Sequence, residues 1–174
     1  MGMIELLRER RSIRKYAARK VEVEKLKLLH EAALRSPSSK NINPWEFVFV
    51  DDKALILQLQ DCKPHGVAPL KTTPLAIVVC ADENKNDVWV EDCSIASILL
   101  QLTAQSLGLG SCWIQVRLRN HNNEQLAEKY IQNLLNIPEN MRVLSIITVG
   151  YPETSRAGKP FDDLQFEKIK TNRF

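Results

Sequence analysis

The residues best suited to binding an anion are clustered between Arg10 and Tyr16, where cations and a hydroxyl stand close together. Few carboxylates precede Glu22, so no acidic run neutralises this cluster. The planar fork of an arginine side chain can form two parallel charge-assisted hydrogen bonds with a phosphate group. We therefore expect Arg10, Ser12 and Arg14 to bind a phosphate-bearing ligand. The alternative is a basic helix end that faces solvent and is favoured by the helix dipole.

A second polar stretch, from Ser36 to Pro44, is rich in serine, asparagine and proline. Such residues break regular structure, so we expect a loop here. Its hydroxyl and amide groups are suited to contacts with a polar ligand. An ordinary turn between a helix and a strand has the same composition, and the residues alone leave both possibilities open.

Several common catalytic motifs are absent from the sequence. There is no G-x-G-x-x-G turn after a strand, no G-x-x-x-x-G-K-[ST] loop and no G-x-S-x-G elbow. The histidines lack metal-ligand spacing, and the four cysteines form no C-x-x-C pair, so we expect no metal site and buried, reduced cysteines. If the protein is an enzyme, a bound cofactor is expected to supply the chemistry, because no catalytic side chain stands out.

Composition indicates an ordinary globular protein. The 174 residues are 44% hydrophobic and 26% charged, with a net charge of +3, which fits one domain with a sizeable core. The apolar runs are too short to span a membrane, and no signal-like segment opens the chain, so we expect a cytoplasmic protein. An aromatic content of 6% and the lack of a long basic stripe argue against a nucleic-acid partner.

Periodicity predicts helices and strands that interleave without clean alternation, which favours an α+β fold, or a mixed sheet between helical layers. In the first helix, which starts at Met3, Leu6 and Leu7 share one apolar face with Met3. The other predicted helices are Val21–Leu34, Ala54–Leu59, Val88–Leu107 and a helix capped by Asn122 or Asn123 that runs to Leu135; the predicted strands are Trp45–Val50, Leu75–Ala81, Ser111–Val116 and Arg142–Val149.

The last part of the chain, residues 151–174, has too few apolar residues to fold on itself. It either frays or packs as an arm on another surface. We therefore expect residues 1–150 to form a single domain to which 151–174 belongs as a C-terminal arm.

Four motifs, taken in order, resemble the flavin-dependent nitroreductase family. They cover nearly the whole chain, and their order and separations agree with the family. The motifs are Arg10–Tyr16, Ser36–Phe47, Glu91–Ala96 and Leu107–Ile114.

The resemblance implies an FMN-binding homodimer with an active site at each side of the interface, and a largely antiparallel central sheet of four to five strands between helical layers. It also implies that the C-terminal arm is exchanged between the subunits. The residues implied to hold FMN are Arg10, Arg11, Ser12 and Arg14 at the phosphate and ribityl chain, Pro37, Ser38, Ser39 and Asn41 of the opposite subunit at the ring, the backbone of Trp113, Ile114 and Gln115 at its reactive edge, and Lys159 and Arg156 of the arm at the phosphate.

The chain departs from the family pattern in two places. Phe161 stands where many relatives carry a second basic arm residue, and Gly66, Pro69 and Lys71 occupy a region in which larger members place an asparagine and a lysine near the flavin. Because a long helical insert is also missing, we expect a more open pocket.

The activity that the resemblance implies is electron transfer from NADH or NADPH, through FMN, to a nitroaromatic, quinone or other electron-poor acceptor. In this activity the flavin carries the chemistry, and no side chain is expected to be catalytic. The alternatives are a binding protein without catalytic activity, or specialised flavin chemistry such as dehalogenation.

Overall fold

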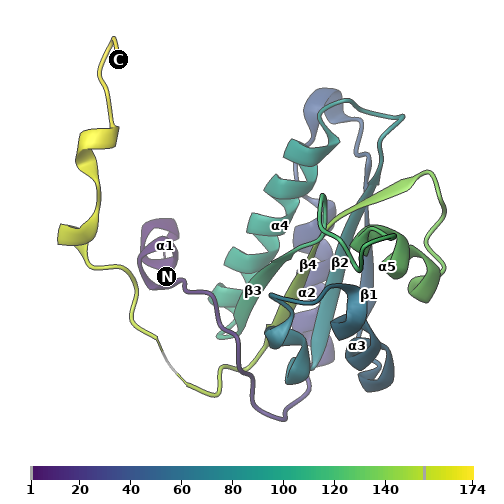
Figure 1. Cartoon of the computed structure of the whole chain (residues 1–174). Helices are drawn as coiled ribbons and strands as arrows, with labels where there is room; N and C mark the ends of the chain where they lie inside the picture. The colour runs from purple at the N-terminus through teal and green to yellow at the C-terminus, as the bar shows by residue number, and fades with distance from the viewer. Residues whose placement is uncertain (1, 155) are drawn as a thin grey trace.

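Helices cover both faces of an antiparallel sheet (Figure 1). The structure, a computed structural model, describes residues 2–154 and 156–174. The expected α+β class is confirmed, although every pairing between the described strands is antiparallel and the sheet is not mixed. Across the sheet the strands follow the order β1 (Trp45–Val50), β2 (Leu75–Asp82), β4 (Met141–Gly150) and β3 (Gly110–Gln115).

The two faces of the sheet bury separate apolar cores, because successive side chains of a strand point to opposite faces. In β2, Ile77 and Val79 belong to one core, whereas Ala76 and Val78 belong to the other. Helices α2 (Val23–Leu34) and α4 (Trp89–Ser106) cover the first face, and α3 (Lys53–Leu59) and α5 (Ala127–Leu135) cover the second. The predicted layering is therefore confirmed.

The start of α5 differs from the prediction. The helix begins at Ala127 and has no side-chain cap, whereas the sequence predicted a cap at Asn122 or Asn123. Instead, the Asn122 Oδ1 atom accepts hydrogen bonds from the backbone amides of Glu124 and Gln125, at 2.9 and 2.8 Å. Asparagine side chains close turns in this way as readily as they cap helices. The predicted helix cap is therefore wrong, and Asn122 closes a turn before the helix.

Helix α1 (Met3–Glu9) lies apart from the sheet in Figure 1, next to the C-terminal arm. Only part of its predicted apolar face is covered: Leu6 is 7% exposed, but Met3 is 58% and Leu7 is 51% exposed. The arm crosses the end of α1 at Gly158, where a Cβ atom would clash with the backbone carbonyl of Arg8.

Beyond this crossing the arm contains two short 3₁₀ turns, η4 (Phe161–Asp163) and η5 (Phe166–Lys168). Its side chains are exposed, including five large apolar ones: Phe161, Leu164, Phe166, Ile169 and Phe174.

Two neighbouring leucines of α2 test the first core. Leu29 is 0% exposed and Leu28 is 44% exposed. We expect Leu29→Ala to lower the free energy of unfolding by about 2–5 kcal/mol, because it removes buried methyl groups and leaves a cavity. Leu28→Ala should change it by less than about 0.5 kcal/mol. Chemical denaturation at one fixed protein concentration measures both, and equal losses would contradict the described face of α2.

Candidate functional site

The segment that carries the basic motif is fixed along the outer side of β3. The backbone amide of Ile13 donates to the carbonyl of Ser111 at 2.9 Å, next to a parallel bridge between Ser12 and Ser111. Gly110 permits this approach, since a Cβ atom there would lie 2.6 Å from the Ile13 side chain. The backbone of the motif is therefore held rigidly, and its polar side chains can project into solvent.

Tyr16 holds the other end of this segment. Its buried hydroxyl lies 2.7 Å from the Thr148 Oγ1 atom and donates to the carbonyl of Ile13, also at 2.7 Å. Burial raises the pKa of the Tyr16 phenol well above its usual range. The phenol therefore stays neutral and acts as a structural anchor.

The motif side chains line a polar cavity of about 240 Å³, which we call the basic hollow: Arg10, Arg11, Ser12, Arg14 and Arg156. Among the described residues, no carboxylate lies within 4.0 Å of these guanidinium groups. Several like charges gathered without protein counter-ions repel one another and favour a bound anion. The phosphate expectation is therefore consistent with the geometry.

A second cavity of about 290 Å³ adjoins the basic hollow, because Arg14 lines both. We call it the edge hollow; it is lined by Arg14, Lys63, Gly66, Ala68, Pro69, Cys112, Trp113, Ile114 and Gln115. The two hollows lie on either side of Arg14; cations dominate the basic hollow, whereas the edge hollow combines apolar residues with Lys63 and Gln115. This arrangement suits a ligand that joins a phosphate to a flat ring.

The exposed edge of β3 supplies backbone groups to the edge hollow. The Ser111 carbonyl points outward, toward Ile13, so alternation along the strand also turns the backbone groups of Trp113 and Gln115 outward. The Lys63 ammonium donates to the Gln115 carbonyl at 2.7 Å. This leaves the amides of Trp113 and Gln115 available to a ligand.

Lys63 and Cys112 were not identified from the sequence. Lys63 lies in the irregular stretch between α3 and β2, where spacing carries little information, and only the fold brings it to β3. Its partial burial lowers the pKa of its ammonium group. Cys112 was expected only to be buried, which it is, together with the other cysteines.

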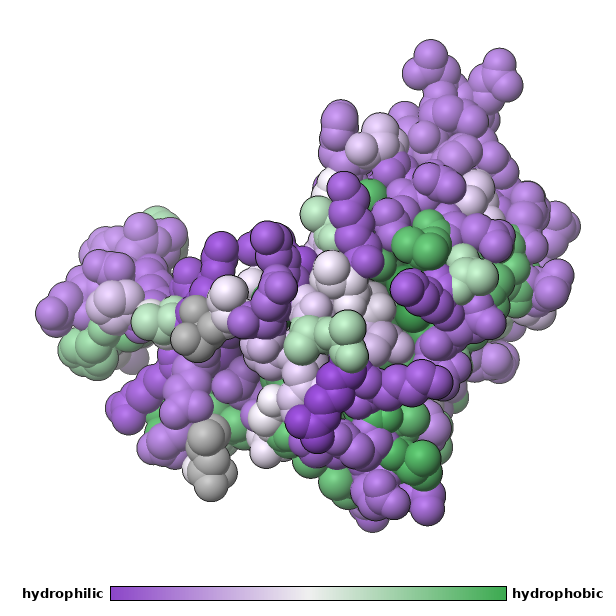
Figure 2. All heavy atoms as spheres, turned by 90° about the horizontal axis from the view of Figure 1, so that it is seen from below, coloured by the Kyte–Doolittle hydropathy of each residue, from purple (hydrophilic) through white to green (hydrophobic). Residues whose placement is uncertain are grey.

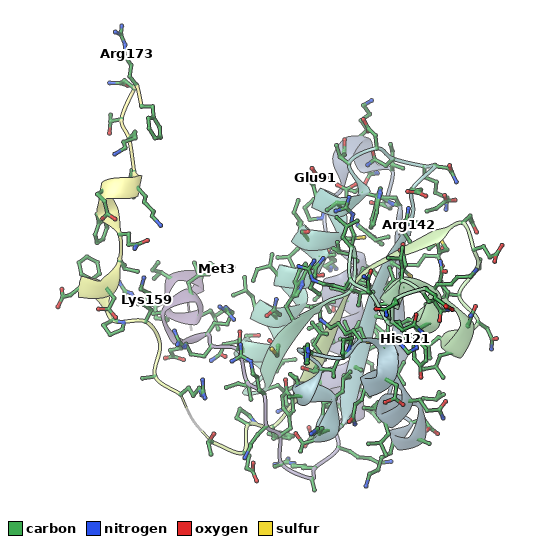
Figure 3. All side chains as sticks on the ribbon, viewed as in Figure 1. Met3, Glu91, His121, Arg142, Lys159 and Arg173 are labelled. Carbon is green, nitrogen blue, oxygen red and sulfur yellow. The ribbon has the colours of Figure 1, made fainter. Side chains whose placement is uncertain are left out.

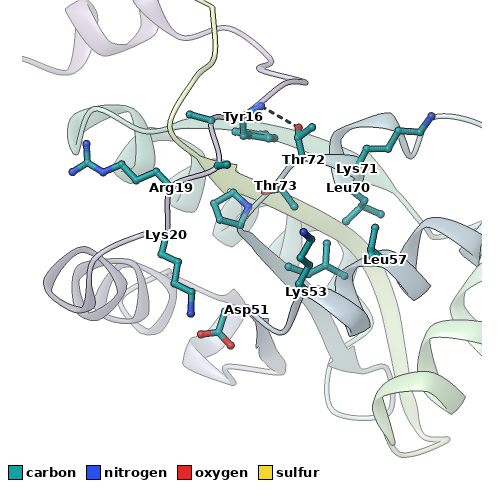
Figure 4. A pocket seen from close by; sticks show the side chains of 14 residues that line it. Tyr16, Arg19, Lys20, Asp51, Lys53, Leu57, Leu70, Lys71, Thr72 and Thr73 are labelled. Carbon is teal, nitrogen blue, oxygen red and sulfur yellow. Dashed lines mark hydrogen bonds between the residues drawn. The ribbon is translucent and has the colours of Figure 1, made fainter.

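Lys71, in contrast, lies outside both hollows. It lines a separate cavity of about 360 Å³ on the other side of Tyr16 (Figure 4). There, the Tyr16 amide donates to the Thr72 Oγ1 atom at 3.1 Å. Lys71 therefore lines neither the basic hollow nor the edge hollow. Two cations of the arm were predicted to contact the phosphate. Arg156 lines the basic hollow, and Lys159 does not.

The predicted Pro37–Asn41 loop does not join this site within one chain. The Ser39 amide donates to the Asp92 Oδ1 atom at 2.9 Å, at the start of α4. The basic hollow is fixed beside Ser111, just after the end of α4. At 1.5 Å per residue, the two ends of this 18-residue helix are about 27 Å apart. In Figure 3, Glu91 marks the first end, whereas Lys159 and Met3 lie far from it, beside α1.

The remaining surface offers no competing metal centre. Within residues 2–154 and 156–174, no group of three or more His, Cys, Asp or Glu side chains could hold a metal ion.

The helices that the structure describes include none with the length and apolar character of a membrane span. On the face shown in Figure 2, hydrophobic atoms form separate patches among hydrophilic ones.

Cys112 provides a chemical test of the edge hollow. Burial raises the pKa of its thiol, and the nearby arginines offset this only in part. Because the thiolate is the reactive form, we expect slow alkylation at pH 8 that accelerates as the pH rises toward the thiol pKa. Mass spectrometry after iodoacetamide treatment measures the rate, and Cys112→Ala is the control. Rapid labelling of Cys112 at pH 7 would contradict its described burial.

Comparisons with known proteins identify the family of this chain. The family model described as "Nitroreductase family" matches residues 7–64 and 63–151. A protein of Methanothermobacter thermautotrophicus whose name joins NADH dehydrogenase and NAD(P)H nitroreductase is 38% identical over 155 residues, which are 87% of this chain and 78% of that protein. The FMN reductase [NAD(P)H] of Bacillus subtilis is 27% identical over 91% of this chain and 69% of its own length.

The structure of an FMN-dependent nitroreductase from Clostridium difficile R20291 has a TM-score of 0.97 with this chain. The two are 47% identical, and the match covers 99% of this chain and 100% of the other. The match therefore spans the segments that carry both hollows. The chain belongs to the nitroreductase family.

Proposed function

We propose that this protein is an FMN-dependent oxidoreductase that takes electrons from NADH or NADPH and passes them to a nitroaromatic, quinone or other electron-poor acceptor. The observation that carries the proposal is that the basic hollow and the edge hollow are neighbours, both lined by Arg14. The names of relatives support it, because they include an FMN-dependent nitroreductase and an FMN reductase that uses NAD(P)H.

The residues present fit FMN. Its phosphate carries negative charge that Arg10, Arg14 and Arg156 would neutralise, and Ser12 adds a hydroxyl donor. Its flat ring matches the mainly apolar walls of the edge hollow. When bound, FMN supplies the redox chemistry, accepting hydride from the nicotinamide and delivering electrons to the acceptor.

The protein's own part in catalysis is electrostatic. The outward amides of Trp113 and Gln115 are fixed donors, because β3 is hydrogen-bonded to β4 along its length. Preorganised donors of this kind stabilise negative charge without needing to reorient. Lys63 adds a positive charge beside them and occupies the Gln115 carbonyl, which would otherwise repel an electron-rich ring.

We further propose a homodimer in which the Pro37–Asn41 loop of one subunit lines the flavin bound by the other. Within one chain the loop and the basic hollow lie at opposite ends of α4, so one FMN can contact both only if a second copy brings its loop to the hollow. Antiparallel packing of two α4 helices would achieve this. Exposed apolar residues on α1, α4 and the arm supply a surface for it, including Met3, Ile95, Ile98 and Phe166.

Arg10→Ala should weaken FMN binding more than it weakens the fold. A charge-assisted bidentate contact contributes about 1.5–3 kcal/mol, which corresponds to a roughly ten- to hundredfold loss of affinity. Arg35→Ala is the matched control, because this arginine is exposed and pairs with Glu31 on α2. Fluorescence titration of the flavin-free proteins with FMN gives both constants. An Arg10→Ala protein that keeps its FMN affinity and only melts earlier would make Arg10 structural.

The catalytic proposal is tested by anaerobic reduction followed by a panel of acceptors. The purified protein should be yellow and bleach with NADH or NADPH, and a nitroaromatic or quinone should restore the colour. A halogenated aromatic in the panel tests for dehalogenation. A flavin that neither NADH nor NADPH bleaches would favour a binding protein without catalytic activity.

Steady-state kinetics test whether donor and acceptor occupy one pocket in turn. If they do, double-reciprocal plots at several fixed donor concentrations should be parallel. Intersecting lines would exclude a shared pocket.

Removal of residues 151–174 should abolish both the dimer and FMN retention. Burying the exposed arm side chains on a partner is worth about 1.5–3 kcal/mol each before ordering costs, and the arm also carries Arg156. Light scattering of the full chain and of the protein truncated after Gly150 measures the assembly. A truncated protein that stays dimeric with FMN bound would remove the arm from the mechanism.

A further inference from the structure

The backbone of the Pro37–Asn41 loop is bent into a conformation that its residues do not favour. Lys40 and Asn41 have φ angles of 51° and 56°, and Asn43 follows with 52°. Residues other than glycine rarely adopt this left-handed region. The short polar side chain of asparagine helps it to do so by forming local hydrogen bonds, whereas the lysine side chain does not. Hydrogen bonds between Ser38 and Asn43, both at 2.8 Å, support this conformation from within the loop, and contacts from outside add to them.

Asp92 contacts the loop from outside, through the Ser39 amide. Its side chain lies in the first turn of α4 and is only 3% exposed. The Oδ1 atom accepts from the Ser39 amide at 2.9 Å, and Oδ2 accepts from the Asn86 side-chain amide at 2.6 Å. Within the described chain, no Lys, Arg or His nitrogen lies within 4.0 Å of this carboxylate.

A buried carboxylate without a cation is costly unless hydrogen bonds satisfy it. The loop amide and Asn86 provide these bonds, and the positive end of the α4 dipole adds to them. Asp92 and Ser39 therefore depend on each other: the loop amide satisfies the acid, and the acid fixes the loop backbone just before its left-handed residues.

We propose that Asp92 is a positioning residue for the flavin site of the partner subunit. It holds Ser39, and through it the Pro37–Asn41 loop, in the shape that lines the partner's FMN. The proposal rests on the proposed function and extends it. It also gives a role to the Glu91–Ala96 motif, because Asp92 faces the loop whereas its neighbour Glu91 is exposed.

The first experiment compares Asp92→Ala, Asp92→Asn and Ser97→Ala. Ser97 is the matched control: it is also a buried polar residue of α4, and its hydroxyl lies 3.3 Å from that of Ser145, away from the loop. Three quantities are measured: FMN affinity, hydrogen exchange of the loop amides in the flavin-free protein, and the unfolding midpoint.

We expect Asp92→Ala to weaken FMN binding by roughly tenfold or more and to speed exchange of the Ser39 amide. Asp92→Asn keeps one acceptor oxygen, so its FMN affinity and its rate of Ser39 exchange should lie between those of Asp92→Ala and the wild type. Ser97→Ala should lower only the unfolding midpoint. If Asp92→Ala lowers stability but leaves both FMN affinity and Ser39 exchange unchanged, Asp92 is merely structural and the proposal is overturned.

A mixed dimer tests whether the loop acts on the partner's flavin. One subunit carries Asp92→Ala and the other carries Arg10→Ala, with different affinity tags to isolate the pair. If the loop acts across the interface, both defects fall in one site, and the other site should bind one FMN per dimer with wild-type affinity. Two equally weakened sites would mean that the loop serves its own chain, which overturns the assignment to the partner.

The exchange measurement separates this proposal from the proposed function. If the wild-type protein binds no FMN, the proposed function fails, whereas faster exchange of Ser39 in Asp92→Ala would still establish the tether. If wild-type protein binds FMN and Asp92→Ala binds it equally well, only the positioning role fails.

Discussion

The site is built on a constraint: the fold holds several guanidinium groups close together, and no carboxylate of the described residues lies within 4.0 Å of them. The backbone of the basic motif is fixed to β3 by the Ile13–Ser111 hydrogen bond and anchored by Tyr16, so Arg10 and Arg14 cannot move far apart to relieve their repulsion. A bound anion lowers this electrostatic energy without any change in the fold. The proposed affinity for a phosphate therefore rests on a constraint on the backbone as much as on the residue types.

The length of α4 divides the site between its two ends. The basic hollow lies near the end of the helix, beside Ser111, and the Pro37–Asn41 loop is tied to its first turn through Asp92. A rigid helix keeps these two parts apart in every copy of the chain. An assembly of two copies is then a geometric requirement for a flavin that contacts both parts, and the uncovered apolar side chains of α1 and the arm are consistent with such an assembly.

The sheet illustrates how local pattern and tertiary context combine. The apolar run from Leu75 to Ala81 correctly predicted a buried central strand, because a strand covered on both faces cannot alternate in polarity. The apolar face of α1 was only partly right, since Leu6 is buried but Met3 and Leu7 are exposed in the single chain. A helical periodicity shows which side of a helix is apolar, but not whether anything in the same chain covers it.

The sequence by itself determined the positions of the strands and most helices, the α+β class, the absence of common catalytic motifs and the clustering of cations at Arg10–Arg14, because these depend on neighbouring residues. Only the tertiary structure placed Lys63 beside Gln115, Lys71 outside the site and Asp92 against Ser39. In each case the segments concerned are separated along the chain by loops, and a loop has no periodic pattern from which its path could be predicted. Short-range physics fixed the elements, and packing between distant elements decided which of their side chains meet.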